Sequence, residues 1–301
     1  MTTTGEALGG MNLFDAARAA GVRFSAEVLP TDHHVEANGM RLHYLDWGNA
    51  HLPPMVLLHG GAQSAHSWDF FALAMRDHFH VVAVDQRGHG DSDWSDEGDY
   101  DAPFHVADLA DFTSLLGIER FVLVGLSMGG RNAYSFAARH PARVERLVIV
   151  DVGPDVAAEG RRHIQEFMEG TDTFESFDWL VERVLQYNPR RPEVQVRGSL
   201  INNLKQLPDG RWTWKHDRRR GIRRDRGGEM DEAAWAALAG VQAPTLLVRG
   251  AESNILSEAT AARMRGVLRE SHFVEVPGAG HLVPSDNPVA FEEAVRTYLA
   301  V

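Results

Sequence analysis

Short apolar runs of strand length recur along the chain and alternate with longer segments that have a helical pattern. The apolar runs are rich in Val and Leu and show no polar face, which is typical of parallel strands buried on both sides. These runs span residues 55–58, 81–84, 121–124, 147–150, 245–248 and 273–276. The helical patterns that separate most of them span residues 66–76, 104–116, 130–139, 257–268 and 288–299. This alternation predicts an α/β fold with a mostly parallel central sheet flanked by helices, and a ligand site at the carboxyl ends of the strands.

The alternation is framed by a hairpin and interrupted by a long insertion. Asn38-Gly39, between two segments of strand pattern, predicts a β-hairpin, because both residues tolerate positive φ. After the sixth predicted strand, the interval from 155 to 236 contains helical patterns, prolines and tryptophans but no clear buried strand. We therefore predict a helical cap over residues 155–236, inserted between two parts of an α/β core at 28–154 and 237–301. Residues 1–27 form a predicted N-terminal extension with a short amphipathic helix near 13–20.

Composition narrows the class of protein. The chain of 301 residues has no cysteine, which excludes disulfides, zinc-thiolate sites and a cysteine nucleophile. Its formal net charge of −12 argues against general binding of nucleic acid. No apolar stretch approaches the length of a membrane span, and the N-terminus lacks the features of a secretory signal. We expect a cytoplasmic protein with a small-molecule substrate and no nucleic-acid or membrane partner. The N-terminal extension could pack on a second subunit, so a homodimer is possible.

The most informative motif is Gly-Leu-Ser-Met-Gly-Gly at 125–130, directly after the apolar run at 121–124. A serine hydroxyl is a weak nucleophile unless a tight turn between a strand and a helix exposes it to a base. Glycines at 125 and 129 allow such a turn around Ser127, since they have no Cβ. The same turn aims the amide of Met128 at the oxygen on which negative charge develops. The motif therefore predicts a nucleophile elbow.

Together with further motifs, the chain resembles the α/β-hydrolase superfamily over nearly all of residues 33–301. His59-Gly60-Gly61, after the run at 55–58, is similar to the family's oxyanion loop, and the resemblance implies that the amide of Gly61 is the second donor beside that of Met128. The segment 85–92, Asp-Gln-Arg-Gly-His-Gly-Asp-Ser, is similar to a structural turn of the family. Gly280-His281 stands where the family has its catalytic histidine. The resemblance implies a cofactor-independent enzyme. No spacing of the histidines indicates a metal site.

The third member of the triad departs from the family pattern. The family commonly has its acid in a turn Gly-x-x-Ser-Asp after the strand at 245–249, but this chain has Asn254 at the position of the aspartate. A neutral amide cannot stabilise an imidazolium as a carboxylate does. Three alternatives are open: Asp151 at the end of the strand 147–150, as in lactonases, deformylases and related amide hydrolases; Glu252 in the same turn; or an inactivating change at 254. We favour Asp151, because strand ends position side chains better than loop tips.

These residues predict a serine hydrolase that cleaves a small ester, lactone or amide through an acyl-enzyme intermediate. Ser127 would attack, His281 would carry the proton and Asp151 would orient the histidine. A C–C bond or N-acyl (deformylase-like) hydrolase would use the same triad, and a receptor-like protein without turnover is the alternative favoured only by position 254. Serine at 127 disfavours dehalogenases and epoxide hydrolases, which carry aspartate there. The tryptophans expected to contact substrate are Trp68, Trp179 and Trp214.

Overall fold

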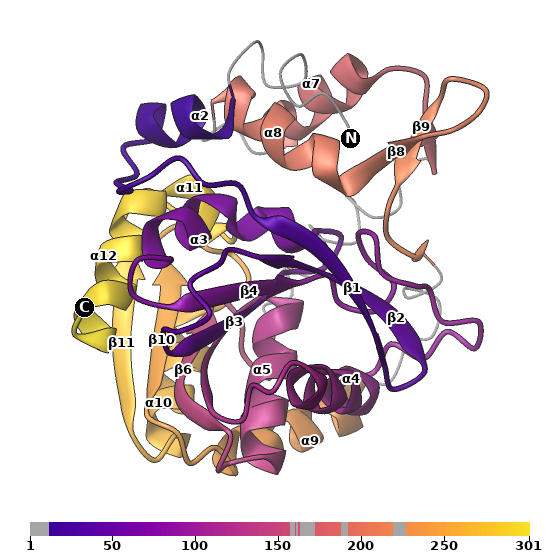
Figure 1. The fold of residues 1–301 in the computed structure, drawn as a ribbon. Helices are drawn as coiled ribbons and strands as arrows, with labels where there is room; N and C mark the ends of the chain where they lie inside the picture. Colours follow the sequence, from indigo (N-terminus) through magenta and orange to yellow (C-terminus); the bar gives the residue numbers. More distant parts are fainter. Residues whose placement is uncertain (1–11, 157–159, 161, 163–171, 188–191, 219–226) are drawn as a thin grey trace.

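A mostly parallel eight-stranded sheet forms the centre of the protein (Figure 1). The computed structural model describes residues 12–156, 160, 162, 172–187, 192–218 and 227–301. The strand order is β1-β2-β4-β3-β5-β6-β10-β11, with β1 and β2 antiparallel and the strands from β4 to β11 parallel. Their bounds are β1 Thr31–Ala37, β2 Met40–Asp46, β3 Pro54–Leu58, β4 His80–Val84, β5 Phe121–Leu126, β6 Val144–Val150, β10 Thr245–Gly250 and β11 Ser271–Val276. The predicted fold class is confirmed.

Helices cover both faces of the sheet, which explains why its central strands are apolar on both sides. Along β3, Met55 and Leu57 belong to one buried cluster, whereas Val56 and Leu58 belong to the other. The first cluster includes side chains of α2, α3 and α12, and the second includes side chains of α4, α5, α9 and α10. The helices are α2 Leu13–Ala19, α3 Asp69–Met75, α4 Ala102–Leu115, α5 Met128–Arg139, α9 Gly227–Ala239, α10 Glu258–Val267 and α12 Pro288–Leu299. Among the described residues, no helix is both long and apolar enough to cross a membrane.

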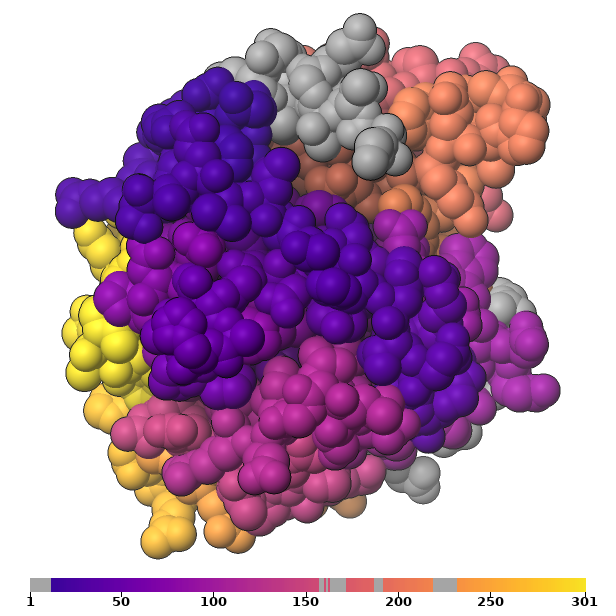
Figure 2. All heavy atoms as spheres, in the orientation of Figure 1, coloured from indigo at the N-terminus to yellow at the C-terminus, as the bar shows by residue number. Residues whose placement is uncertain are grey.

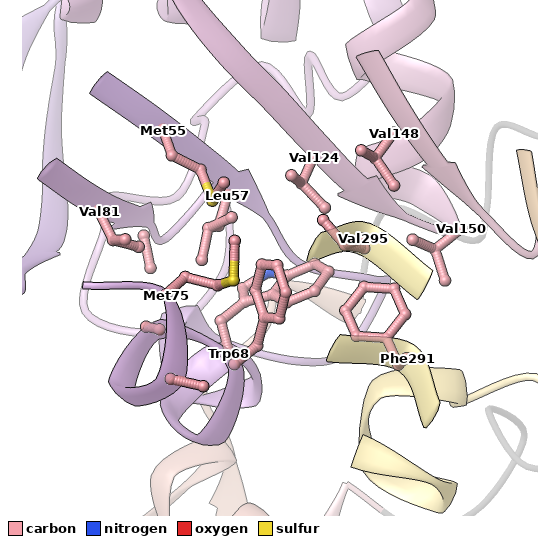
Figure 3. Close-up of a cluster of buried hydrophobic side chains, with 14 of the residues drawn as sticks. Met55, Leu57, Trp68, Met75, Val81, Val124, Val148, Val150, Phe291 and Val295 are labelled. Carbon is pink, nitrogen blue, oxygen red and sulfur yellow. The ribbon is translucent and has the colours of Figure 1, made fainter. Parts of the chain in front are cut away.

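Trp68 lies in the first of these clusters and not in a pocket, which corrects its assignment as a substrate contact. It ends the 3₁₀ helix η1 (Ala65–Trp68), and its side chain is completely buried. Figure 3 shows the indole among Met75, Leu57 and Phe291, and the rings of Trp68 and Phe291 are 6.2 Å apart. The helical pattern at 66–76 therefore corresponds to η1 followed by α3, and the tryptophan joins α3 to α12.

The insertion after β6 has its own hydrophobic cluster and contains a small sheet as well as helices, so the predicted helical cap is not helical throughout. Three short antiparallel strands pair in the order β7-β9-β8, with bounds Thr173–Phe174, Trp212–Trp214 and Leu204–Gln206. Helices α7 (Phe177–Tyr187) and α8 (Glu193–Asn203) pack with them around a buried cluster that includes Leu180 and Val196. One of the helical patterns in the interval 155–236, at residues 161–169, lies largely outside the described residues. The boundaries at 155 and 236 stay a prediction.

The insertion lies at one end of the molecule, beside the N-terminal segment. Figure 2 shows the indigo N-terminal residues and the orange part of the insertion at the same end, and α2 lies beside α8 (Figure 1). Polar contacts join the end of the insertion to the loop after β4. The amide of Asp217 donates to the carbonyl oxygen of Gly88 at 2.8 Å, its carboxylate accepts from Tyr100 at 2.5 Å, and Lys215 pairs with Asp91 at 2.7 Å. These contacts hold the base of the insertion against the core.

Candidate active site

Ser127 stands in a strained turn between β5 and α5. Its backbone has φ 53° and ψ −116°, a conformation that L-residues rarely adopt. The glycines of the motif are required by space: a Cβ at Gly125 would lie 2.3 Å from the carbonyl oxygen of Gly129, and a Cβ at Gly129 would lie 2.2 Å from that of Leu58. The strand and the helix thus approach closely, and the serine projects from the end of the sheet. The helix also begins here, so its positive N-terminal dipole faces the hydroxyl.

Three of the predicted site residues lie in one hydrogen-bonded line. The Oγ atom of Ser127 is 2.9 Å from Nε2 of His281, and Nδ1 of His281 is 2.8 Å from Oδ2 of Asp151. Nδ1 must donate to the carboxylate, which only accepts, so in the neutral imidazole Nε2 accepts the serine proton. These three side chains have the geometry of a nucleophile, a base and an acid that orients the base.

Asp151 is the carboxylate that the structure brings to His281. It follows β6 directly, has φ 49° and is completely buried. Glu252 is exposed and Asn254 is half-buried in the turn after β10. Both ring nitrogens of His281 have partners within 3 Å, namely Ser127 and Asp151. Neither residue of the turn is therefore needed to complete the line.

The turn after β10 still contacts Asp151, which the sequence analysis missed. The amide of Gly250 donates to Oδ1 of Asp151 at 3.0 Å, and the hydroxyl of Ser253 lies 2.5 Å from Oδ2. A Cβ at Gly250 would lie 2.0 Å from the carbonyl oxygen of Gly280, so the turn also passes very close to the loop that carries His281. The Gly-x-x-Ser pattern was the signal in the sequence that could have identified these contacts.

The loop after β3 carries the predicted oxyanion donor. Gln63 accepts a hydrogen bond from the amide of Gly60 at 2.9 Å through its Oε1 atom, so that amide is engaged within the loop. The next amide, that of Gly61, is the candidate donor, and a Cβ on Gly61 would meet nothing within 4 Å. The second candidate, the amide of Met128, lies at the first residue of α5. The two donors thus come from different elements, and their separation depends on how the loop is fixed to the helix.

Gln86, another residue that the sequence analysis missed, makes this connection. Its Nε2 atom donates to the carbonyl oxygen of His59 at 2.7 Å, and its Oε1 atom accepts from Asn132 on α5 at 2.7 Å. The backbone amide of Gln86 also donates to Nε2 of His59 at 3.0 Å. The ring hydrogen of His59 is therefore on Nδ1, which donates to the carbonyl oxygen of Gly60 at 2.7 Å. Gln86 is buried, so these bonds fix the oxyanion loop relative to α5.

One group of described residues has the spacing of metal ligands, but its hydrogen bonds indicate a structural role. The candidate ligand atoms of His43, Asp85 and Asp91 all lie within 4.8 Å of one another. Asp85 accepts hydrogen bonds from the amides of Ala65 and Asp91 and from Nδ1 of His43, while the carboxylate of Asp91 pairs with Lys215. Burial raises the pKa of Asp85, but the hydrogen bonds from His43 and from the amide of Asp91, together with the charges of His59 and His43, outweigh it, so the pKa is lowered. This network joins β2, η1 and the loop after β4 beneath the insertion.

Trp179 and Trp214, the other two tryptophans expected at the site, belong to the insertion. Trp214 is buried edge-on against Phe174, with ring centroids 5.4 Å apart. Trp179 is 45% exposed and stacks on Phe174, with ring centroids 5.8 Å apart. The ring of Trp214 also lies 5.4 Å from that of His216, and the ring of His216 stacks on that of His89 in the loop after β4. Their contact with substrate stays a prediction.

Comparisons with known proteins agree with the fold. Residues 53–288 match the family model of the alpha/beta hydrolase fold. The chain is 32% identical over 281 residues to an esterase of Mycobacterium tuberculosis, covering 90% of each protein. It is 28% identical over 270 residues to an N-formylmaleamate deformylase of Pseudomonas putida, covering 88% of this chain and 95% of that protein. The crystal structure of E-2-(acetamidomethylene)succinate hydrolase superposes with a TM-score of 0.82 at 26% identity, over 90% of this chain and 100% of that one.

The fold and the relatives therefore define a hydrolase of the serine type. The chain belongs to the α/β-hydrolase family, as the sequence motifs indicated.

Proposed function

We propose that the protein is a cofactor-independent serine hydrolase that cleaves a small ester, lactone or amide through an acyl-enzyme intermediate. The observation that carries the proposal is the line of hydrogen bonds from Ser127 through His281 to the buried Asp151, with distances of 2.9 and 2.8 Å. A nucleophile and base in hydrogen-bond contact, with the base oriented by a third group, support covalent catalysis at an acyl carbon.

In the first half of the reaction, Oγ of Ser127 attacks the carbonyl carbon of the substrate while Nε2 of His281 accepts its proton. The amides of Gly61 and Met128 stabilise the negative charge on the carbonyl oxygen. The tetrahedral intermediate collapses when the C–O or C–N bond to the leaving group breaks, and the imidazolium gives its proton to that group. In the second half, His281 deprotonates a water that attacks the acyl-enzyme, and Ser127 leaves as the restored hydroxyl. Asp151 stabilises the imidazolium in both halves.

The names of the relatives support esters and amides as the substrate class. One is an esterase, one is a deformylase, and a third acts on a compound that contains an acetamido group. Cleavage of a C–C bond would use the same residues, but no observation favours it. The receptor-like alternative depended on the lack of an acid at position 254, and the contact between Asp151 and His281 removes that argument.

Labelling with a fluorophosphonate tests the proposal, since this reagent phosphonylates an activated serine. We expect one adduct per chain, on the peptide that contains Ser127, and no adduct in Ser127→Ala. The matched control is Ser114→Ala, because Ser114 lies on the exposed surface of α4 and its loss should leave labelling unchanged.

The same three proteins are then assayed with p-nitrophenyl acetate, a simple lactone and an acyl anilide. A burst of one equivalent of nitrophenol from the wild type, absent in Ser127→Ala, is the expected sign of an acyl-enzyme. Turnover that survives in Ser127→Ala, or labelling at a different serine, would refute the proposal.

A further inference from the structure

The hydroxyl of Ser253 lies on the same carboxylate oxygen that holds the histidine. Its Oγ atom is 2.5 Å from Oδ2 of Asp151, and Nδ1 of His281 is 2.8 Å from that same oxygen. A carboxylate only accepts hydrogen bonds, so Ser253 donates. Hydrogen bonds to an ionised acceptor are shorter and stronger than neutral ones, which agrees with the short contact.

The direction of this bond is fixed by the backbone around Ser253. Its Oγ atom accepts the amide of Ile255 at 3.1 Å and lies 3.4 Å from the amide of Leu256, the donor of a second, longer bond. With these donors on its lone pairs, the hydroxyl hydrogen is left to point at Asp151. Asp151 is completely buried, so donors from the protein replace the water that would otherwise solvate its charge.

The turn that contains Ser253 also holds the histidine loop. The amide of Glu252 donates to the carbonyl oxygen of Ala279 at 2.9 Å, two residues before His281. The turn thus contacts both members of the acid–base pair. It bonds to Asp151 through the amide of Gly250 and the hydroxyl of Ser253, and to the loop of His281 through backbone hydrogen bonds. This is a different task from supplying the carboxylate itself.

We propose that Ser253 is a positioning residue of the hydrolytic reaction, holding Oδ2 of Asp151 toward His281 and sharing part of its negative charge. The proposal rests on the proposed function, since it assigns Ser253 a role in that triad. Without the hydroxyl, the carboxylate loses one of its donors and can rotate away from the imidazole. The unshared charge on Oδ2 would also favour the imidazolium over the neutral base.

The test compares Ser253→Val with Ser253→Thr, because these two side chains have the same shape and only threonine keeps the hydroxyl. We expect the valine variant to lose about tenfold in kcat/KM for p-nitrophenyl acetate, as for a lost bond to a charged group. The acidic limb of its pH–rate profile should move to higher pH. The threonine variant should retain the wild-type limb. If the valine variant does not fold, Ser253→Ala replaces it under the same criteria.

Ser257→Ala is the matched control for a merely structural loss. Ser257 caps α10 by accepting the amide of Thr260 at 3.1 Å, so its removal should lower the melting temperature without moving the pH profile. Equal profiles in Ser253→Val and wild type, or equal behaviour of the valine and threonine variants, would overturn the inference.

A second readout does not need turnover. We expect the proton on Nδ1 of His281, bonded to Asp151, to give a downfield NMR resonance in the wild type that shifts or broadens in Ser253→Val but not in Ser253→Thr. If the wild-type protein is not labelled at Ser127, the proposed function fails, but this resonance still tests whether Ser253 positions Asp151 against His281. An unchanged resonance in Ser253→Val would count against that role.

Discussion

Replacing Asp151 by asparagine changes one atom of the site and reverses one hydrogen bond. In the native structure, Oδ1 accepts the amide of Gly250, and Oδ2 accepts both the hydroxyl of Ser253 and the Nδ1 hydrogen of His281. An asparagine amide has one acceptor and one donor group. If its NH₂ group faced Gly250, it would meet a buried backbone donor that cannot turn away, whereas the hydroxyl of Ser253 can rotate, so we expect the oxygen to stay at Gly250 and the NH₂ group to face His281.

This orientation puts the imidazole in the wrong tautomer. The NH₂ group would donate to Nδ1 of His281, the ring hydrogen would move to Nε2, and Nε2 could no longer accept the proton of Ser127. We expect kcat for ester hydrolysis to fall about 10⁴-fold, which corresponds to about 5.5 kcal/mol of transition-state stabilisation. Binding of substrate should change little, since Asp151 lies behind the histidine and is completely buried.

The assay is single-turnover acylation by p-nitrophenyl acetate, which isolates the step in which His281 acts as base. Glu252→Gln is the control, because Glu252 lies in the turn where the family commonly has its acid. We expect Glu252→Gln to acylate at the wild-type rate, since Glu252 is exposed. An Asp151→Asn protein that acylates within about threefold of wild type, far from the loss expected for a missing triad acid, would refute the assignment.

Three further outcomes are expected. Gln86→Leu leaves the carbonyl oxygen of His59 without its donor and loosens the oxyanion loop, so the affinity for a boronate transition-state analogue should fall about tenfold, more than that for substrate. Gly129→Ala places a Cβ 2.2 Å from the backbone oxygen at the end of β3, and urea denaturation should show a loss of about 3 kcal/mol in unfolding free energy. Burial lowers the pKa of His66, but the carboxylate of Asp69 outweighs it and raises the pKa from 6.5 to about 9. Because the pKa of His66 is higher in the folded protein, the stabilisation from this pair is fully present below about pH 6.5 and is lost as the pH rises through about 9. We expect the free energy of unfolding to fall by about 1 kcal/mol over that range in the wild type but not in His66→Gln.

The core of the fold was predictable because its strands are buried on both faces. A strand such as β5, with all of its residues buried, can only have an apolar sequence, and the pattern of Val and Leu identifies it. The order of the strands in the sheet could not be derived from their pattern alone. β3, for example, pairs with β4 and β5, and β6 pairs with β10 nearly 100 residues later, and such pairings leave no mark on local periodicity.

The insertion was predicted less well, for a physical reason. Its strands have only two or three residues each, too few to show alternation, and one of them, β9, carries both Trp212 and Trp214, whose side chains belong to a small cluster. Trp68 was misassigned because an aromatic residue close to the oxyanion loop fits a pocket as well as a core. Its buried position depends on α12, which comes from the other end of the chain.

In the site, sequence identified the residues whose backbone is special and missed those that act through side-chain contacts. Ser127 was found because close packing at the elbow demands glycines, which stand out in a sequence. Ser253 and Gln86 make their contacts with residues far away in the chain, and a serine or a glutamine in a loop carries no local signal of such a partner. Asp151 was favoured because it ends a strand, and its carboxylate lies 2.8 Å from Nδ1 of His281.

The position of the acid follows from the sheet. β6 and β10 are neighbouring parallel strands in which Val150 pairs with Val248, so their carboxyl ends emerge about 5 Å apart at the same edge. A carboxylate can therefore reach the same imidazole from either strand end, provided that the other end supplies hydrogen-bond donors and not a second negative charge. Two carboxylates at this spacing would raise the cost of ionisation for one of them. Asparagine at 254, together with the amide of Gly250 and the hydroxyl of Ser253, meets that condition, and it explains why the turn after β10 keeps its contacts with the site although it supplies no carboxylate to His281.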